Sequence, residues 1–111
     1  MSEQVKELIK LELIPIDVPA KWDGRWRLIL FDVPEVKRQL RDQVRHLIKK
    51  FRCVRLQQSV WIHPFACHEQ FRQIVKAYGT NRDILLIETN EVEGASQILK
   101  IFRKTYPRTK F

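Results

Sequence analysis

The densest run of charge in the sequence lies between positions 36 and 55, where basic residues are frequent and Asp42 is the only acid. Like charges at i and i+4 on a helix repel by about 0.2–0.5 kcal/mol, yet Arg41, Arg45 and Lys49 keep that spacing. A helix that keeps such repelling pairs is predicted to bind a polyanionic ligand. The alternative is a basic face that is only solvated. The candidate nucleic-acid-binding residues are Lys37, Arg38, Arg41, Arg45, Lys49, Arg52 and Arg55.

One carboxylate, Asp32, directly follows the apolar run over residues 28–31 and precedes Val33 and Pro34. At the end of a buried strand it could close a turn, cap the next helix or bind a divalent cation. Magnesium prefers six oxygen ligands, usually including one or two carboxylates. A single aspartate is therefore a poor site, and two copies facing each other across a dimer axis would be a better one. From spacing alone, a turn or cap is favoured.

Other residues that could do chemistry show no catalytic pattern. His46, His63 and His68 could act as general bases, but the sequence contains no nucleophile elbow, phosphate loop or HExxH motif. Cys53 and Cys67 have neither CxxC nor zinc spacing and are expected to be reduced thiols of a cytoplasmic protein. No base-reading module is present. Tryptophans beside apolar runs, such as Trp61, are expected to pack rather than to stack on bases.

Length and composition indicate one globular domain. The chain has 111 residues, of which 44% are apolar and 31% charged, enough for a single modest core. No apolar run approaches the roughly 20 residues of a membrane span, and the acidic N-terminus is not that of a signal peptide, so no membrane partner is expected. Residues 25–111 carry a net charge of +10, which favours contact with phosphate backbones.

The period of the apolar residues predicts the elements that must position these side chains. The apolar face of the first core helix is expected to contain Val36, Leu40, Val44, Leu47, Ile48 and Phe51. Asn90, with Glu93 three residues later, predicts the cap of the last helix, and the basic tail after that helix is expected to fray. In chain order the predicted elements are a helix over 3–13, a strand over 25–32, a helix over 35–51, one or two strands over 52–63, a helix over 68–79, a strand over 83–89 and a helix ending before Pro107.

This order predicts an α+β fold of the ferredoxin-like βαββαβ type, an antiparallel sheet with both core helices on one face. A terminal helix would be added at each end. We divide the chain into an N-terminal helix and linker, residues 1–20, and the ferredoxin-like domain with its C-terminal helix, residues 21–111. The second face of the sheet needs a cover, for which a partner chain and the two terminal helices are the candidates.

Two stretches of the sequence, KWDGRWRLILFDVPE and LQQSVWIHP, together resemble two related groups of proteins. One is the Cas2 family of small CRISPR-associated proteins, and the other is the Cas2-like domain of PaaX-type transcriptional regulators. In both, a strand ends in an acid–proline turn, here Asp32-Val33-Pro34, and a basic helix leads to a strand such as Gln58-Ser59-Val60-Trp61. The resemblance covers roughly residues 20–90. The WDGRWR and WIHP segments are closer to the PaaX side.

The resemblance implies a ferredoxin-like homodimer, and on the Cas2 side a partner of the CRISPR integrase that holds double-stranded DNA, or RNA, on its basic surface. Members are often described as metal-dependent nucleases in which the aspartate matching Asp32 binds magnesium or manganese near the two-fold axis. Asp32 would then be the catalytic metal ligand, supported by Ser59. The same dimer can also act as a non-catalytic bridge.

The two relatives differ in what precedes this domain. PaaX-type regulators carry a winged helix-turn-helix there, whereas about twenty residues precede Trp22 here. Giving this length more weight than the wording of the motifs, we expect a cytoplasmic, dimeric CRISPR adaptation protein of the Cas2 type. The alternative is a non-enzymatic PaaX-like regulatory domain without its helix-turn-helix, which binds a partner or a small effector. A toxin-like ribonuclease is a third interpretation.

Overall fold

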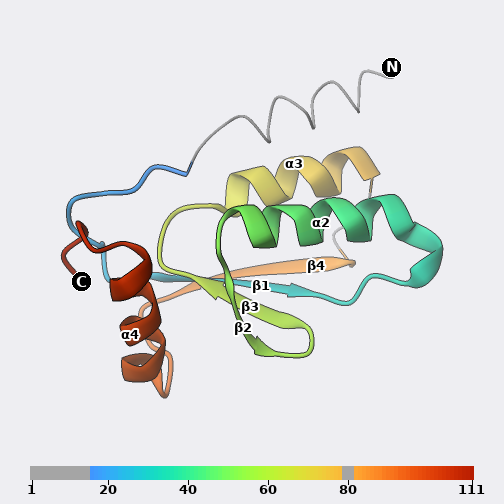
Figure 1. The fold of residues 1–111 in the computed structure, drawn as a ribbon. Coiled ribbons are helices and arrows are strands. Elements are labelled where there is room, and N and C mark those ends of the chain that lie inside the picture. The colour runs from blue at the N-terminus through green and yellow to red at the C-terminus, as the bar shows by residue number, and fades with distance from the viewer. Residues whose placement is uncertain (1–15, 79–81) are drawn as a thin grey trace.

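The computed structural model describes residues 16–78 and 82–111, so the predicted helix over 3–13 lies outside the described residues. Within them, one short 3-10 helix, three α-helices and four strands alternate along the chain (Figure 1). None of the described helices is long and apolar enough to cross a membrane. The elements are β1 (Trp26–Phe31), η1 (Glu35–Lys37), α2 (Arg38–Lys50), β2 (Val54–Gln57), β3 (Val60–His63), α3 (His68–Tyr78), β4 (Ile84–Thr89) and α4 (Ala95–Thr105).

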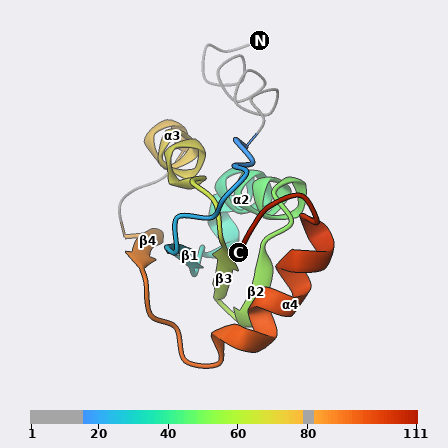
Figure 2. The ribbon, with the colours of Figure 1, turned by 90° about the vertical axis from the view of Figure 1, so that its left-hand side faces the viewer.

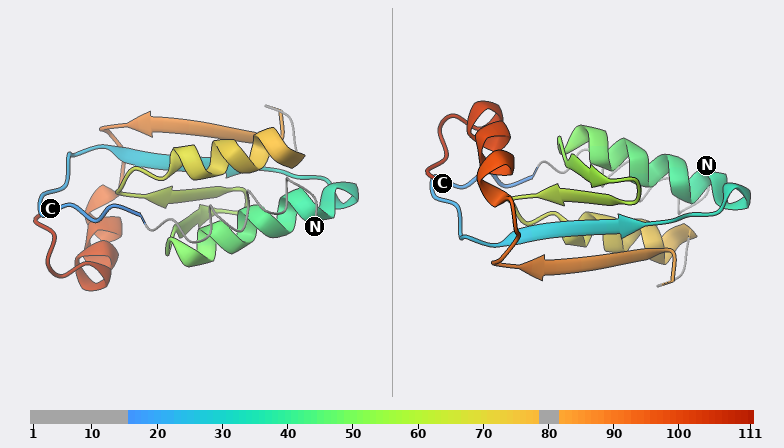
Figure 3. Two further views of the ribbon diagram at one scale, coloured as in Figure 1. Left: turned by 90° about the horizontal axis from the view of Figure 1, so that it is seen from above. Right: turned by 90° about the horizontal axis from the view of Figure 1, so that it is seen from below.

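The four strands form one sheet in the order β2-β3-β1-β4. Every pairing is antiparallel, and β1 lies in the interior between β3 and β4. Figure 3 shows the sheet from above and below, with β2 and β4 at its two edges. This order confirms the predicted ferredoxin-like α+β fold.

The main core lies between the sheet and the pair of helices α2 and α3, which cover the same face (Figures 1 and 2). Alternation along β1 sends Ile29 and Phe31 to this face. From α2, Leu40, Val44 and Leu47 meet them, because residues three or four apart share one side of a helix. The predicted helical periodicity therefore identified the buried side of α2.

The other face of the sheet is covered in part by α4. Ile98 and Phe102 pack on Trp26 and Ile62 in a second cluster of buried side chains. On β4, which is distant from α4, Leu85 remains 56% exposed and Ile87 37% exposed. Of the covers suggested by the sequence, the C-terminal helix thus covers the part of this face formed by Trp26 and Ile62.

Three local expectations are wrong. Val36 is 91% exposed, because η1 winds with a tighter period and α2 begins only at Arg38. Helix α4 begins after Gly94, whose φ of 80° is left-handed, so Asn90 does not cap it. The tail is also ordered: the Thr109 hydroxyl donates a hydrogen bond to the Pro19 carbonyl at 2.8 Å.

Candidate nucleic-acid interface

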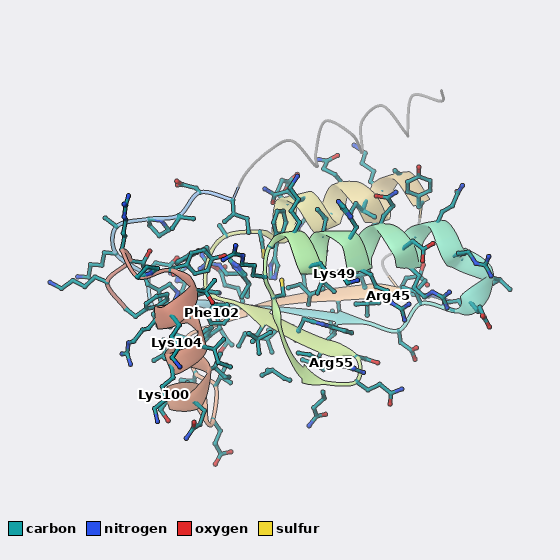
Figure 4. All side chains as sticks on the ribbon, in the orientation of Figure 1. Arg45, Lys49, Arg55, Lys100, Phe102 and Lys104 are labelled. Atoms are coloured by element: carbon teal, nitrogen blue, oxygen red, sulfur yellow. The ribbon has the colours of Figure 1, made fainter. Side chains whose placement is uncertain are left out.

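An open hollow of about 750 Å³ lies between α2, the end of β1 and the β2–β3 hairpin. Five basic side chains line it, together with the carboxylate of Asp32 and the side chains of Gln58, Ser59 and Trp61. Figure 4 labels three of the five, two on α2 and one on β2. The basic residues are Arg41, Arg45, Lys49, Arg52 and Arg55.

The local structure explains why these five side chains meet. On α2, Arg41, Arg45 and Lys49 follow one another at i and i+4, so they form a row along one side of the helix. On β2, Val54 and Leu56 pack in the α4 cluster, and alternation therefore sends Arg55 to the α2 side of the sheet. Arg52 lies in the connection between the two elements.

Arg52 has a backbone conformation that is unusual for its type. Its φ is 57°, in the left-handed region where glycine is preferred at the end of a helix. The amide of Cys53 donates to the carbonyl of Ile48 at 3.0 Å, and the amide of Arg52 donates to that of Lys49 at 3.1 Å. These two bonds form a Schellman motif. A charged residue at this position fits a functional use of its side chain in the hollow.

Replacing Arg52 with glycine should therefore stabilise the fold while weakening anion binding. The left-handed conformation costs a non-glycine residue about 1–2 kcal/mol, and glycine loses about 0.5–1 kcal/mol more backbone entropy on folding. The net expected gain is about 0.5–1 kcal/mol in the free energy of unfolding, measured by urea denaturation. Lys50→Gly is the control, since it removes the same charge but should destabilise α2 by up to about 1 kcal/mol. A destabilised Arg52→Gly variant would contradict this account.

Two further arginines of the hollow, Arg55 and Arg41, differ in the contacts that their guanidinium groups make. The guanidinium carbon of Arg55 lies 5.5 Å from the centre of the Trp61 ring, and its Nη2 donates to the Gln58 carbonyl at 3.1 Å. Trp61 itself stacks on Phe31 with ring centres 4.6 Å apart, in agreement with the packing role expected for it. The Nε of Arg41 is buried and has no hydrogen-bond partner among the described residues.

Asp32 and Ser59 line the same hollow, as the metal-site expectation requires. The amide of Phe31 donates to the Ser59 carbonyl at 3.0 Å, which places the hairpin turn beside Asp32. The helix-cap interpretation of Asp32 is wrong, because the residue that caps η1 is Pro34 and no side chain bonds there.

The residues of one chain do not fit a magnesium or manganese ion at Asp32. Among the residues that the structure describes, no three His, Cys, Asp or Glu side chains are grouped to hold a metal ion. The five basic side chains around the hollow would also repel a divalent cation. A metal site here would need a second carboxylate from another copy of the chain.

Two of the seven predicted nucleic-acid-binding residues do not reach the hollow. Lys37 lies in η1, and its ammonium pairs with the carboxylate of Asp83 at 2.7 Å. Arg38 is exposed at the start of α2 but does not line the hollow. The tertiary structure therefore brings together five of the seven predicted nucleic-acid-binding residues and leaves Lys37 and Arg38 outside the hollow.

The motifs that carried the family resemblance are joined through the carbonyl of Pro64. It accepts hydrogen bonds from Trp22 Nε1 at 2.6 Å and from Arg27 Nη1 at 2.8 Å. Arg27 is only 7% exposed, and its Nη2 also pairs with Asp23 at 2.7 Å and with Glu88 at 3.1 Å. The side-chain hydrogen bond from Arg27 holds the pKa of Asp23 below its usual value. This network was not predicted from the sequence, although Asp23, an acid four residues before Arg27, was a signal for it.

His63, at the end of the second motif, is structural. It is fully buried, its Nδ1 accepts a hydrogen bond from the amide of Phe65 at 3.0 Å, and its Nε2 lies 3.3 Å from the Tyr106 hydroxyl. Burial lowers the pKa of His63 to about 4, so it is neutral and enclosed at neutral pH. Burial likewise raises the pKa of the Cys67 thiol to about 12. Neither group is placed for catalysis.

Comparison with known proteins gives one family. A protein-family model, described as the PaaX protein central Cas2-like domain, matches residues 19–100. No curated protein and no solved structure gives a significant match. The matched residues include both motifs and every residue that lines the hollow.

Proposed function

The chain belongs to the family of PaaX protein central Cas2-like domains, and on that premise we propose that it binds the phosphate backbone of duplex DNA through the cationic hollow. In this role it neither reads bases nor hydrolyses the strand. Backbone contacts supply most non-specific affinity and position a protein on the duplex without sequence information. A PaaX-type regulator and a Cas2-type bridge could both use such a surface.

The observation that carries the proposal is the concentration of unpaired positive charge at the hollow. In the described chain, Arg27, Lys37 and Arg72 form salt bridges, whereas several exposed cations outside the hollow, Lys100 and Lys104 among them, do not. None of the five cations of the hollow forms one with the described residues. Phosphate oxygens are the natural partners for such a group, because each contact releases condensed counterions.

We propose binding without hydrolysis because of the charges around Asp32. Asp32 is a single carboxylate beside five cations, an environment that attracts phosphate and repels the metal ion a nuclease would need. Homodimerisation, the integrase partner and a role in CRISPR adaptation remain predictions, as does the cytoplasmic location. The exposed Leu85 and Ile87 of the open sheet face would suit a second copy of the chain.

The test is the salt dependence of duplex binding by a variant with both Arg45→Gln and Lys49→Gln. A suitable duplex has about 24 base pairs, which at 3.4 Å per base pair is roughly twice the 41 Å long axis of the structure. Loss of two phosphate contacts should reduce the slope of log affinity against log salt by about 1.8. Fluorescence anisotropy at several salt concentrations measures it.

The matched control is Arg72→Gln with Lys76→Gln on α3, the same residue types at the same spacing and the same change in net charge. The ion pair between Arg72 and Glu69 is exposed and contributes little to stability. We expect a nearly unchanged slope for this control. If the α2 variant behaves like the control, the hollow is only a solvated basic face.

Asp32→Asn tests the non-hydrolytic part of the proposal in the same assay. Removing a negative charge from the hollow should leave duplex affinity the same or higher, and magnesium or manganese should induce no strand cleavage by either protein. Metal-dependent cleavage that disappears in Asp32→Asn would instead establish the nuclease and its metal ligand. Parallel reactions with duplex RNA separate the ribonuclease interpretation.

A second candidate function is the binding of a small anionic effector in the same hollow. Its volume of about 750 Å³ lies within the 300–1,000 Å³ typical of ligand pockets, and the Trp61 ring contributes an aromatic wall. Titration calorimetry with inorganic pyrophosphate tests this function. Stoichiometric binding that the Arg52→Gly variant loses, and that competes with duplex, would favour it.

A further inference from the structure

Helix α4 carries a second row of basic side chains on its outer side. Ile98 and Phe102 are buried against the sheet, whereas Lys100, Ile101 and Lys104 are exposed. From Gly94 to the end of the chain there is no acidic residue. Lys100 and Lys104 repeat the i and i+4 repulsion of Arg45 and Lys49, and neither forms a salt bridge with the described residues.

The fold brings this row to the same edge of the sheet as the hollow. Figures 2 and 3 both show α2 and α4 toward the β2 edge, and α3 and β4 toward the other edge. Helices α2 and α4 pack on opposite faces of the sheet, so β2 with Arg55 lies between the two rows. In Figure 4 the labelled Lys100 and Lys104 lie on α4, to the left of the labelled basic residues of α2 and β2.

The packing of α4 holds its basic row at a defined position. Phe102 is fully buried, and its ring centre lies 5.6 Å from that of His63 and 6.1 Å from that of Trp26. The basic row therefore lies on a helix that Phe102 anchors in the second core cluster, and not on a loose tail. Cations on rigid elements lose less entropy when they bind a ligand.

We infer that the duplex-binding surface continues around the β2 edge onto α4, where Lys100 and Lys104 contact phosphates. This inference rests on the proposed function of the hollow. Two rows on opposite faces of one sheet edge can contact two different phosphate strands at once, which is the arrangement that a duplex offers. A single small anion in the hollow would not require the α4 row.

The test is a variant with Lys100→Gln and Lys104→Gln in the full chain. We expect the salt slope for the same duplex to fall by about 1.8, with an unchanged circular dichroism spectrum and urea midpoint because both side chains are exposed. The control is the α3 variant with Arg72→Gln and Lys76→Gln, which removes two charges at the same spacing. Combining the α2 and α4 changes should lower the slope by about 3.6.

The outcomes separate this inference from the proposed function. If the α2 variant flattens the salt slope and the α4 variant matches the α3 control, the inference is overturned and the proposed function stands. If neither variant differs from the control, both fail. Flattening by both variants, with an additive combination, supports a surface that extends over α2, β2 and α4.

Discussion

Replacing Arg27 with methionine should lower the free energy of unfolding by about 2–4 kcal/mol, since hydrogen bonds to charged groups contribute about 1.5–3 kcal/mol each. The guanidinium is buried and bonded to Asp23, Glu88 and the carbonyl of Pro64. Methionine can fill much of the volume, but it cannot donate to the Pro64 carbonyl or pair with either carboxylate. The two acids are about half exposed, so water solvates them in the variant. The decrease in the free energy of unfolding is therefore smaller than the summed contributions of the lost hydrogen bonds.

The measurement is urea denaturation followed by circular dichroism, with Arg25→Met as the control. Arg25 is exposed two residues before Arg27, and the same substitution there should change stability by no more than about 0.5 kcal/mol. Equal effects at the two positions would show that the network does not hold the two motifs together. The expected difference would establish that the WDGRWR and WIHP segments stabilise the fold.

The second large effect is a loss of stability in acid that depends on His63. The pKa of His63 is about 4 in the folded protein and about 6.5 in an unfolded chain. Between these values the unfolded state binds the proton and the folded state does not, so stability falls as the pH falls. At 1.36 kcal/mol per unit, the complete loss is about 3 kcal/mol, and it is fully developed below pH 4.

A variant with His63→Asn should lack this part of the pH dependence. The asparagine oxygen can accept the hydrogen bond from the amide of Phe65 in place of Nδ1, but it does not titrate. The variant is expected to be less stable than the wild type at pH 7, because it loses contacts with Phe102 and Tyr106, and to show a flatter profile toward pH 4. Burial also lowers the pKa of His68, which affects both proteins in the same way. Parallel profiles would contradict the assignment to His63.

Arg27 and His63 lie in the two motifs that carry the family resemblance, and both predictions concern stability. Arg27 and His63 hold the lead-in to β1 and the end of β3 to each other and to the C-terminal helix through Tyr106. The charged surface proposed to bind DNA is built from other residues. Similarity in the two motifs therefore indicates a shared fold more directly than a shared activity.

Among the described residues, the order of helices and strands could be predicted from the sequence alone. The spacing of Leu40, Val44 and Leu47 predicted the buried side of α2, and the unbroken apolar run predicted a central β1. These patterns are local, because helical and strand periods are properties of neighbouring residues. The βαββαβ order then left few ways to arrange the sheet.

Which charges lie next to one another depends on long-range packing. Arg55 joins Arg41 and Arg45 because β2 folds back beside α2, whereas Lys37 leaves the set because Asp83 lies next to it. The burial of Arg27 depends on Pro64 and Glu88, which are distant in sequence. The position of α4 at the β2 edge depends on the packing of Phe102. Contacts of this kind arise from long-range packing, which no local pattern of residue types records.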